Sequence, residues 1–298
     1  MKSEISKKIR LRSSSYVGNT PLVQIKDKIW AKAEFLNPSG SLKDRMATFI
    51  INNAEQAGLL SIGSTIVEAT SGNAGISFAW LAAERGYKIK IVMPNNMSVE
   101  RKQILKYYGA ELIEVGAGDF DGAIELRDKI CEENGWFNTN QFNNPLNIKA
   151  HFEGTSVEIL NQIKDEELSA FVSGTGTGGT IMGCQERFSK ESPGTKIIAV
   201  EPSESPVMSG GVAGLHGIQG IGDGSKFLVD LEKIDKIYTV STEEAKIKAL
   251  ELSKIGLFVG ISSGANVIAC ERFIEEYNPT GIVVTILCDR GDRYLSCF

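Results

Sequence analysis

The strongest constraint on the fold is a regular alternation of short apolar strand patterns with amphipathic helical patterns. Apolar runs at residues 65–72, 87–94 and 111–116 are each followed by a helical pattern, and the alternation resumes over residues 168–289. Repeated strand–helix units build parallel sheets covered by helices on both faces, with ligands bound at the carboxyl ends of the strands. The sequence therefore predicts an α/β fold.

One segment interrupts this alternation. Residues 138–154 are polar, rich in Asn and contain Pro145, which predicts a crossing between two lobes more than an element of either. We place a boundary near residue 145. The chain has 298 residues and is 42% hydrophobic, which is enough apolar material for one large core or two modest cores.

The charge distribution excludes several classes of partner. Lys and Arg total 32 against 37 Asp and Glu, and the net charge of −5 is spread along the chain, so we expect no binding to nucleic acid. The N-terminus has no apolar signal core, and no uncharged run approaches the roughly 20 residues that span a bilayer. We therefore expect a cytoplasmic protein without membrane contact.

Cysteine and histidine usage narrows the chemistry. The five cysteines form no CxxC pair and no cluster with histidine, so neither a metal site nor a disulfide framework is expected. Only two histidines are present, which leaves few candidates for a Ser-His-Asp or Cys-His mechanism. The sequence therefore indicates chemistry that does not depend on histidine.

The densest glycine cluster runs from Gly174 to Thr180, between a predicted strand and a predicted helix. Backbone N–H groups at such a turn form a phosphate site together with the helix N-terminus, and the threonine hydroxyls at positions 175, 177 and 180 add donors. The same segment fits GxGxxG, and Glu201 ends the next strand where a nicotinamide-dinucleotide site places its ribose carboxylate. These residues leave both a phosphate-bearing cofactor and a dinucleotide open.

Lys43 bears on this choice. It follows Ser41, a predicted helix N-cap, and precedes an apolar stripe that ends at Gly58. The helix dipole in the first turn disfavours an ammonium and lowers the pKa of a lysine toward a neutral, nucleophilic amine. A Schiff-base role is one interpretation, and a solvated surface lysine beside Asp44 and Arg45 is the other.

A further glycine-containing turn, Glu68 to Gly75, also joins a predicted strand to a predicted helix. Its hydroxyls, amide and N–H groups suit the carboxylate of an amino acid lying over a cofactor. A candidate imine lysine, a carboxylate-binding turn and a separate phosphate cradle together describe pyridoxal phosphate carrying an amino acid.

The motifs NPSGSLKDR, EATSGNAGI, NQFNNPLNIKAHFEGT, SGTGTGGTIMG, GIQGIGDG, GISSGAN and CDRGDRYLS follow one another along the chain. From Gly18 almost to Phe298 the chain resembles the cysteine synthase (O-acetylserine sulfhydrylase) and cystathionine β-synthase family of pyridoxal-phosphate enzymes, and is most similar to the B-type bacterial cysteine synthases. The resemblance implies fold type II, like the tryptophan synthase β-subunit, with two lobes that are each a mostly parallel sheet covered by helices. Residues 1–40 and 146–298 would form the large cofactor-binding lobe, and residues 41–145 a small mobile lobe.

The resemblance also implies roles for individual residues. Lys43 would hold the cofactor as an internal aldimine and act as the catalytic base. Asn73 would hydrogen-bond the phenolic oxygen of the cofactor. Cys288 would contact the pyridine nitrogen, where a neutral thiol favours β-elimination over transamination. Further cofactor contacts would come from Gly174, Gly176, Thr177, Gly178, Gly179, Thr180 and Ser263, and substrate contacts from Thr70, Ser71, Gln141 and Gly220.

Two positions depart from the family pattern. Ala74 stands where a threonine is usual, and Asp223 occurs in QGIGDG where QGIGAG is usual. The resemblance implies β-elimination or β-replacement on cysteine or O-acetylserine through an aminoacrylate. Asp223, as a second catalytic residue, would favour release of hydrogen sulfide from cysteine with formation of serine or lanthionine. The alternative is that Asp223 points to solvent.

Two other functions compete with this hypothesis. One is an NAD-type dehydrogenase that uses the Gly174–Gly179 loop, and another is a non-catalytic, cofactor-binding partner of serine acetyltransferase. The resemblance implies a small amino-acid substrate and a homodimer, and it leaves binding to serine acetyltransferase open.

Overall fold

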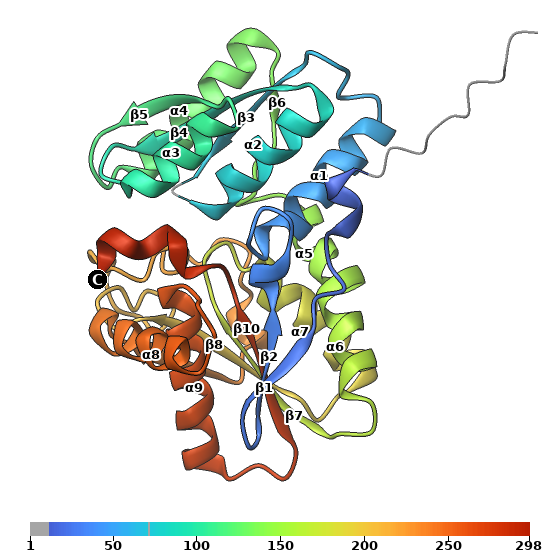
Figure 1. The fold of residues 1–298 in the computed structure, drawn as a ribbon, viewed down its shortest axis with the longest axis vertical. Helices are drawn as coiled ribbons and strands as arrows, with labels where there is room; N and C mark the ends of the chain where they lie inside the picture. The colour runs from blue at the N-terminus through green and yellow to red at the C-terminus, as the bar shows by residue number, and fades with distance from the viewer. Residues whose placement is uncertain (1–11, 71) are drawn as a thin grey trace, which may run out of the picture.

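Two sheets organise the chain (Figure 1). The computed structural model describes residues 12–70 and 72–298, so the prediction for the extreme N-terminus and the substrate role of Ser71 lie outside the described residues. The larger sheet has six strands in the order β1-β2-β10-β7-β8-β9, and the smaller has four in the order β5-β4-β3-β6. Because β1 pairs antiparallel with β2 and the other pairs are parallel, the prediction of two mostly parallel sheets is confirmed.

The strands match the apolar runs of the sequence. The larger sheet contains β1 (Leu22–Lys26), β2 (Ile29–Ala33), β7 (Leu168–Gly174), β8 (Lys196–Pro202), β9 (Lys236–Val240) and β10 (Ile282–Leu287). The smaller sheet contains β3 (Thr65–Ala69), β4 (Lys88–Pro94), β5 (Glu111–Val115) and β6 (Phe137–Asn138). Strand β10 is buried at every position, as expected for a parallel strand covered on both faces.

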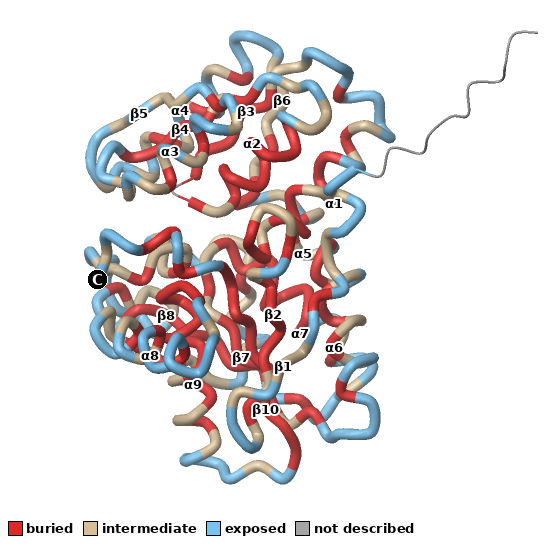
Figure 2. Tube along the Cα trace, in the orientation of Figure 1, coloured by how far each residue is buried: buried red, intermediate tan, exposed pale blue. Residues whose placement is uncertain are grey.

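Helices cover both faces of each sheet. On the smaller sheet, α1 (Lys43–Gln56), α2 (Asn73–Arg85) and α3 (Val99–Tyr107) contribute to the core on one face, and α4 (Phe120–Asn134) packs on the other. On the larger sheet, α8 (Thr242–Lys254) and α9 (Ile261–Tyr277) pack on one face, and α6 (Ser156–Ile163) and α7 (Gly179–Glu191) on the other. Figure 2 shows buried residues gathered within these two layered bodies.

The segment predicted as a crossing is largely helical, so that prediction was wrong for residues 145–154. Helix α5 (Pro145–Ala150) begins at Pro145, whose missing N–H costs nothing in the first helical turn, and Asn144 caps it by accepting from Leu146 N. A π-helical turn, η3 (His151–Thr155), then leads into α6. The lobe boundaries near residues 41 and 146 stay a prediction.

The length and apolar character of the helices bear on whether the chain could cross a membrane. Within residues 12–70 and 72–298, no helix has both the length and the apolar character needed to cross a bilayer.

Candidate active site

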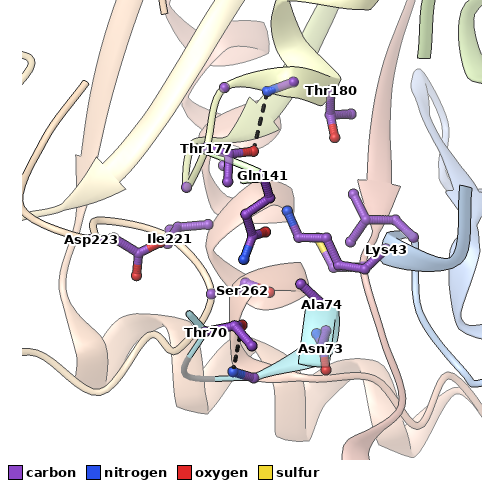
Figure 3. A pocket seen from close by; sticks show the side chains of 18 of the residues that line it. Lys43, Thr70, Asn73, Ala74, Gln141, Thr177, Thr180, Ile221, Asp223 and Ser262 are labelled. Atoms are coloured by element: carbon purple, nitrogen blue, oxygen red, sulfur yellow. Dashed lines mark hydrogen bonds between the residues drawn. The ribbon is translucent and has the colours of Figure 1, made fainter. Parts of the chain in front are cut away.

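A pocket lies where the carboxyl ends of strands from the two sheets meet (Figure 3). Strand β3 leads into Thr70, β7 leads into the glycine-rich loop, and β10 leads into Cys288. The pocket also receives Lys43 and residues of the Gly220–Asp223 loop. The structure therefore brings together the glycine-rich segments and the lysine that the sequence singled out.

Lys43 is the first residue of α1 and extends into this pocket (Figure 3). The helix cap is Leu42 rather than Ser41, although Ser41 Oγ accepts from Lys43 N at 3.3 Å. Burial lowers the pKa of Lys43, and the carboxylate of Asp223 opposes this effect. Because Asp44 and Arg45 are buried, the picture of a solvated lysine beside two surface charges does not hold.

The turn predicted to bind a substrate carboxylate lines the same pocket as Lys43. Thr70 Oγ1 accepts from Gly72 N at 3.2 Å, which leaves its proton for a ligand. The Gln141 side chain also points into the pocket (Figure 3), and its backbone N donates to buried Glu68 at 3.2 Å. Glu68 accepts from Thr139 as well, so a buried carboxylate holds strand β3 and Gln141 in register.

The glycine-rich loop has the shape of an anion cradle. Gly178 is the N-cap of the 13-residue helix α7 with φ +87°, a conformation that favours glycine. A Cβ at Gly179 would meet Asn147 Oδ1 at 2.0 Å, and one at Gly176 would meet the Gly220 carbonyl oxygen at 2.6 Å. Glycine at these two positions lets Asn147 and the Gly220 carbonyl pack directly against the loop, whose N–H groups lie at the positive end of the helix.

Threonine hydroxyls complete the cradle. Thr177 Oγ1 accepts from Asn147 Nδ2 at 2.9 Å and from Gly179 N at 3.4 Å, so its own proton is free to reach an anion. Thr180 also lines the pocket, and its hydroxyl lies 3.2 Å from His151 Nε2. Thr175 does not contribute, because its hydroxyl donates to the Val200 carbonyl oxygen outside this pocket.

The pocket is also lined by a neutral thiol, that of Cys288. Burial is the main cause that raises the pKa of Cys288 to about 12, so the thiol stays protonated. Ser263, a predicted cofactor contact, is fully buried and its Oγ accepts from Cys288 N at 2.9 Å. Ser262 lines the pocket instead, a difference set by the first turn of α9 that the GISSGAN motif alone does not reveal.

Asn73 and Asp223 also line the pocket. Asn73 begins α2 and lines the pocket, with its amide hydrogen-bonded to Asp289 and Arg293. Asp223 faces the pocket from the loop after Gly220 (Figure 3) and also lines an adjoining cavity of about 440 Å³. Burial raises the pKa of Asp223, and Lys43 opposes that shift. The alternative that Asp223 points away from the cleft is therefore wrong.

Glu201, the residue that suggested a dinucleotide site, holds a loop of the protein instead. The Glu201 carboxylate accepts from Met208 N at 2.8 Å and from Ser209 N at 2.9 Å, so it fixes the loop after β8. Glu201 does not line the main pocket. The expected ribose contact is thus occupied by the protein itself, and the dehydrogenase hypothesis loses its carboxylate.

An amine with a lowered pKa, an anion cradle at a helix N-terminus and a neutral thiol surround one pocket. These groups fit a small phosphorylated aldehyde, and they define an enzyme that holds such a cofactor between two α/β lobes. Residues 13–289 match the family described as pyridoxal-phosphate dependent enzyme. The chain belongs to this family, and pyridoxal phosphate is its cofactor.

Several individual proteins within this family are similar to the chain over almost their whole length. The chain is 43% identical to cysteine synthase B of Campylobacter jejuni over 97% of this chain and 98% of the relative. It superposes on O-ureido-L-serine synthase with a TM-score of 0.91 and 37% identity, covering 96% of this chain and 94% of that chain. A hydrogen sulfide-producing enzyme from Fusobacterium nucleatum gives a TM-score of 0.90 and 38% identity, with 95% and 99% covered. Neither the dehydrogenase nor the non-catalytic alternative finds support in these similarities.

Proposed function

We propose that this enzyme catalyses β-elimination and β-replacement on cysteine, releasing hydrogen sulfide and adding water or a second amino acid at the β-carbon. The observation that carries the proposal is the position of Asp223. Its carboxylate lines both the cofactor pocket and the adjoining cavity. Cysteine synthase B and a hydrogen sulfide-producing enzyme are both similar to this chain, which supports the reaction class.

Lys43 supplies the covalent anchor and the base. Pyridoxal phosphate, when bound, withdraws electrons from the substrate α-carbon and so acidifies its proton. The lowered pKa of Lys43 keeps a larger fraction of its amine neutral, and only the neutral amine can accept that proton. The neutral thiol of Cys288 places no charge beside the ring nitrogen, which suits elimination.

The substrate is oriented by its carboxylate. We assign that contact to Thr70, whose hydroxyl can still donate a proton, and to the Gln141 side chain, both of which line the pocket. Ala74 is buried at the start of α2 and offers no hydroxyl to this contact. Gly220 lines the same pocket with φ +97° and is assigned to the substrate side.

Asp223 selects the nucleophile. A carboxylate that lines both cavities repels an anion such as hydrosulfide, whereas it can accept a proton from water or pair with the ammonium of a second amino acid. Its raised pKa brings the carboxyl closer to the working pH of a general base. Simple cysteine synthesis from O-acetylserine and sulfide is the second candidate, favoured by the similarity to cysteine synthase B.

An assay of the purified holoenzyme with cysteine as the sole substrate separates the two candidates. Incubation with cysteine alone should release sulfide continuously and yield serine or lanthionine, whereas a plain cysteine synthase should need O-acetylserine and sulfide. Absence of sulfide release from cysteine would leave cysteine synthesis as the function.

We further infer a cytoplasmic homodimer with a mobile small lobe formed by residues 41–145. The support is the family resemblance together with the two separate sheets, and sedimentation of the purified protein tests the dimer. The family resemblance leaves binding to serine acetyltransferase open, and a pull-down with that enzyme tests it.

A further inference from the structure

The Asn73 side chain is held from two sides by the C-terminal part of the chain. Its Nδ2 donates to Asp289 Oδ2 at 2.5 Å, and its Oδ1 accepts from Arg293 Nη1. Asn73 begins α2 on the smaller sheet, whereas Asp289 and Arg293 follow β10 of the larger sheet. The contact therefore joins elements that are distant in sequence at the wall of the cofactor pocket.

The chemistry of the two partners fixes which way the amide faces. A guanidinium can only donate, so the atom beside Arg293 must be the amide oxygen. An ionised carboxylate can only accept, so the atom beside Asp289 must be the amide nitrogen. Nδ2 carries two protons and Asp289 takes one of them, which leaves the second for an acceptor in the pocket.

Asp289 and Arg293 are themselves fixed in place. Both side chains are buried, Tyr294 donates to the same Asp289 oxygen, and Arg293 Nη2 donates to the Ser39 carbonyl oxygen. A Cβ at Gly260 would meet Asp289 Oδ1 at 2.1 Å, so the absence of a side chain there is what lets the carboxylate occupy this position. Both partners of the amide are therefore buried and held by hydrogen bonds of their own.

We propose that Asp289 and Arg293 are positioning residues that orient the Asn73 amide, so that its second Nδ2 proton is donated to the phenolic oxygen of the cofactor. The proposal rests on the assignment of Asn73 to that oxygen. Without the two charged partners the Asn73 amide can flip. Its carbonyl oxygen would then face the electron-rich phenolic oxygen, and the hydrogen bond from Nδ2 would be lost. The effect is expected on cofactor retention as well as on turnover.

The test uses the holoenzyme carrying Asp289→Asn together with Arg293→Met, which removes both charges with little change in size. The matched control is Arg290→Met with Asp292→Asn, an ion pair of 3.4 Å on partly exposed side chains of the same segment. Cofactor release is followed by the loss of its visible absorbance. Loss of one charge-assisted hydrogen bond should accelerate release by about 10- to 100-fold, with the control pair unchanged.

Repeating the test in an Asn73→Ala background distinguishes orientation of the amide from a general structural role of Asp289 and Arg293. In an Asn73→Ala background, the Asp289 and Arg293 substitutions should add no further acceleration. Equal acceleration in both backgrounds overturns the proposal, because the two residues then act without the amide. If Asn73→Ala accelerates cofactor release and the variant carrying Asp289→Asn with Arg293→Met does not, only the proposed orientation of the amide fails. If Asn73→Ala leaves both release and the visible band unchanged, the assignment of Asn73 to the cofactor fails.

Discussion

Replacing Asp223 by Asn separates the two halves of the proposed reaction. Asparagine has nearly the same shape, so the close packing of this loop on Gly176, where a Cβ would lie 3.2 Å from Asp223 Oδ2, is preserved. Asp223 raises the pKa of Lys43, so its neutralisation lowers that pKa further and leaves the lysine amine available as a base. Abstraction of the α-proton and loss of sulfide should therefore keep their rate.

Completion of the reaction should slow by about 10²-fold or more, the usual contribution of a positioned general base. The assay is rapid mixing with cysteine and continuous sulfide detection. The variant should release about one equivalent of sulfide per active site at the wild-type rate and then turn over slowly. Asp121→Asn, an exposed carboxylate on the adjoining cavity, serves as the control for charge alone.

The pH profile gives an independent check. Because the pKa of Asp223 is raised above its ordinary value, the acid limb of wild-type turnover should lie above the range of a free aspartate and vanish in the variant. A variant that consumes cysteine at the wild-type rate would refute the role of Asp223 as the base, and the simpler assignment as a cysteine synthase would then stand.

Three more predictions concern the lysine, the thiol and a buried ion pair. Lys43→Ala should abolish sulfide release while thermal unfolding changes little, and retention of normal turnover would remove the lysine from the mechanism. Cys288→Ser should keep its activity because a hydroxyl is also neutral, whereas Cys288→Asp should divert product toward side reactions visible by chromatography. The guanidinium of Arg45 holds the pKa of Glu34 at about 2 against burial, so this carboxylate stabilises the fold above about pH 4.5 and loses that contribution as the pH falls toward 2. Glu34→Gln should cost about 3 kcal/mol in urea unfolding at neutral pH and flatten the acid dependence, and an unchanged slope would contradict the pairing.

The parts of the site that are local in sequence could be predicted from it. The Gly174–Thr180 loop carries its own strand, turn and helix signals, and Lys43 stands at a recognisable helix start. The same locality explains an error: Pro145 in a polar, Asn-rich segment predicts a crossing between lobes, whereas it occupies the first turn of α5, the one helical position that proline favours.

Contacts that depend on how distant segments meet could not be predicted. Ser262 and Ser263 are adjacent, and only the packing of α9 against Cys288 decides that Ser262 lines the pocket while Ser263 binds the backbone behind it. The bonds from Asp289 and Arg293 to Asn73 join residues more than two hundred positions apart. No periodicity or spacing in the sequence signals such a contact.

The start of α1 shows why the lysine can be an anchor in a protein with two lobes. Leu42 N donates to the Cys288 carbonyl oxygen at 2.9 Å, and Arg45 donates to Glu34 at 2.6 Å and to Glu158 at 2.7 Å. These bonds tie the first turn of α1 to the segments that follow β10 and β2 and to α6, and the later turns of the helix pack against α2 of the smaller sheet. The first turn is also bonded to α2, because Asp44 accepts from Ser77 Oγ at 2.6 Å. The turn that carries Lys43 is therefore held from both sheets, which fixes the lysine relative to Cys288 and to α2.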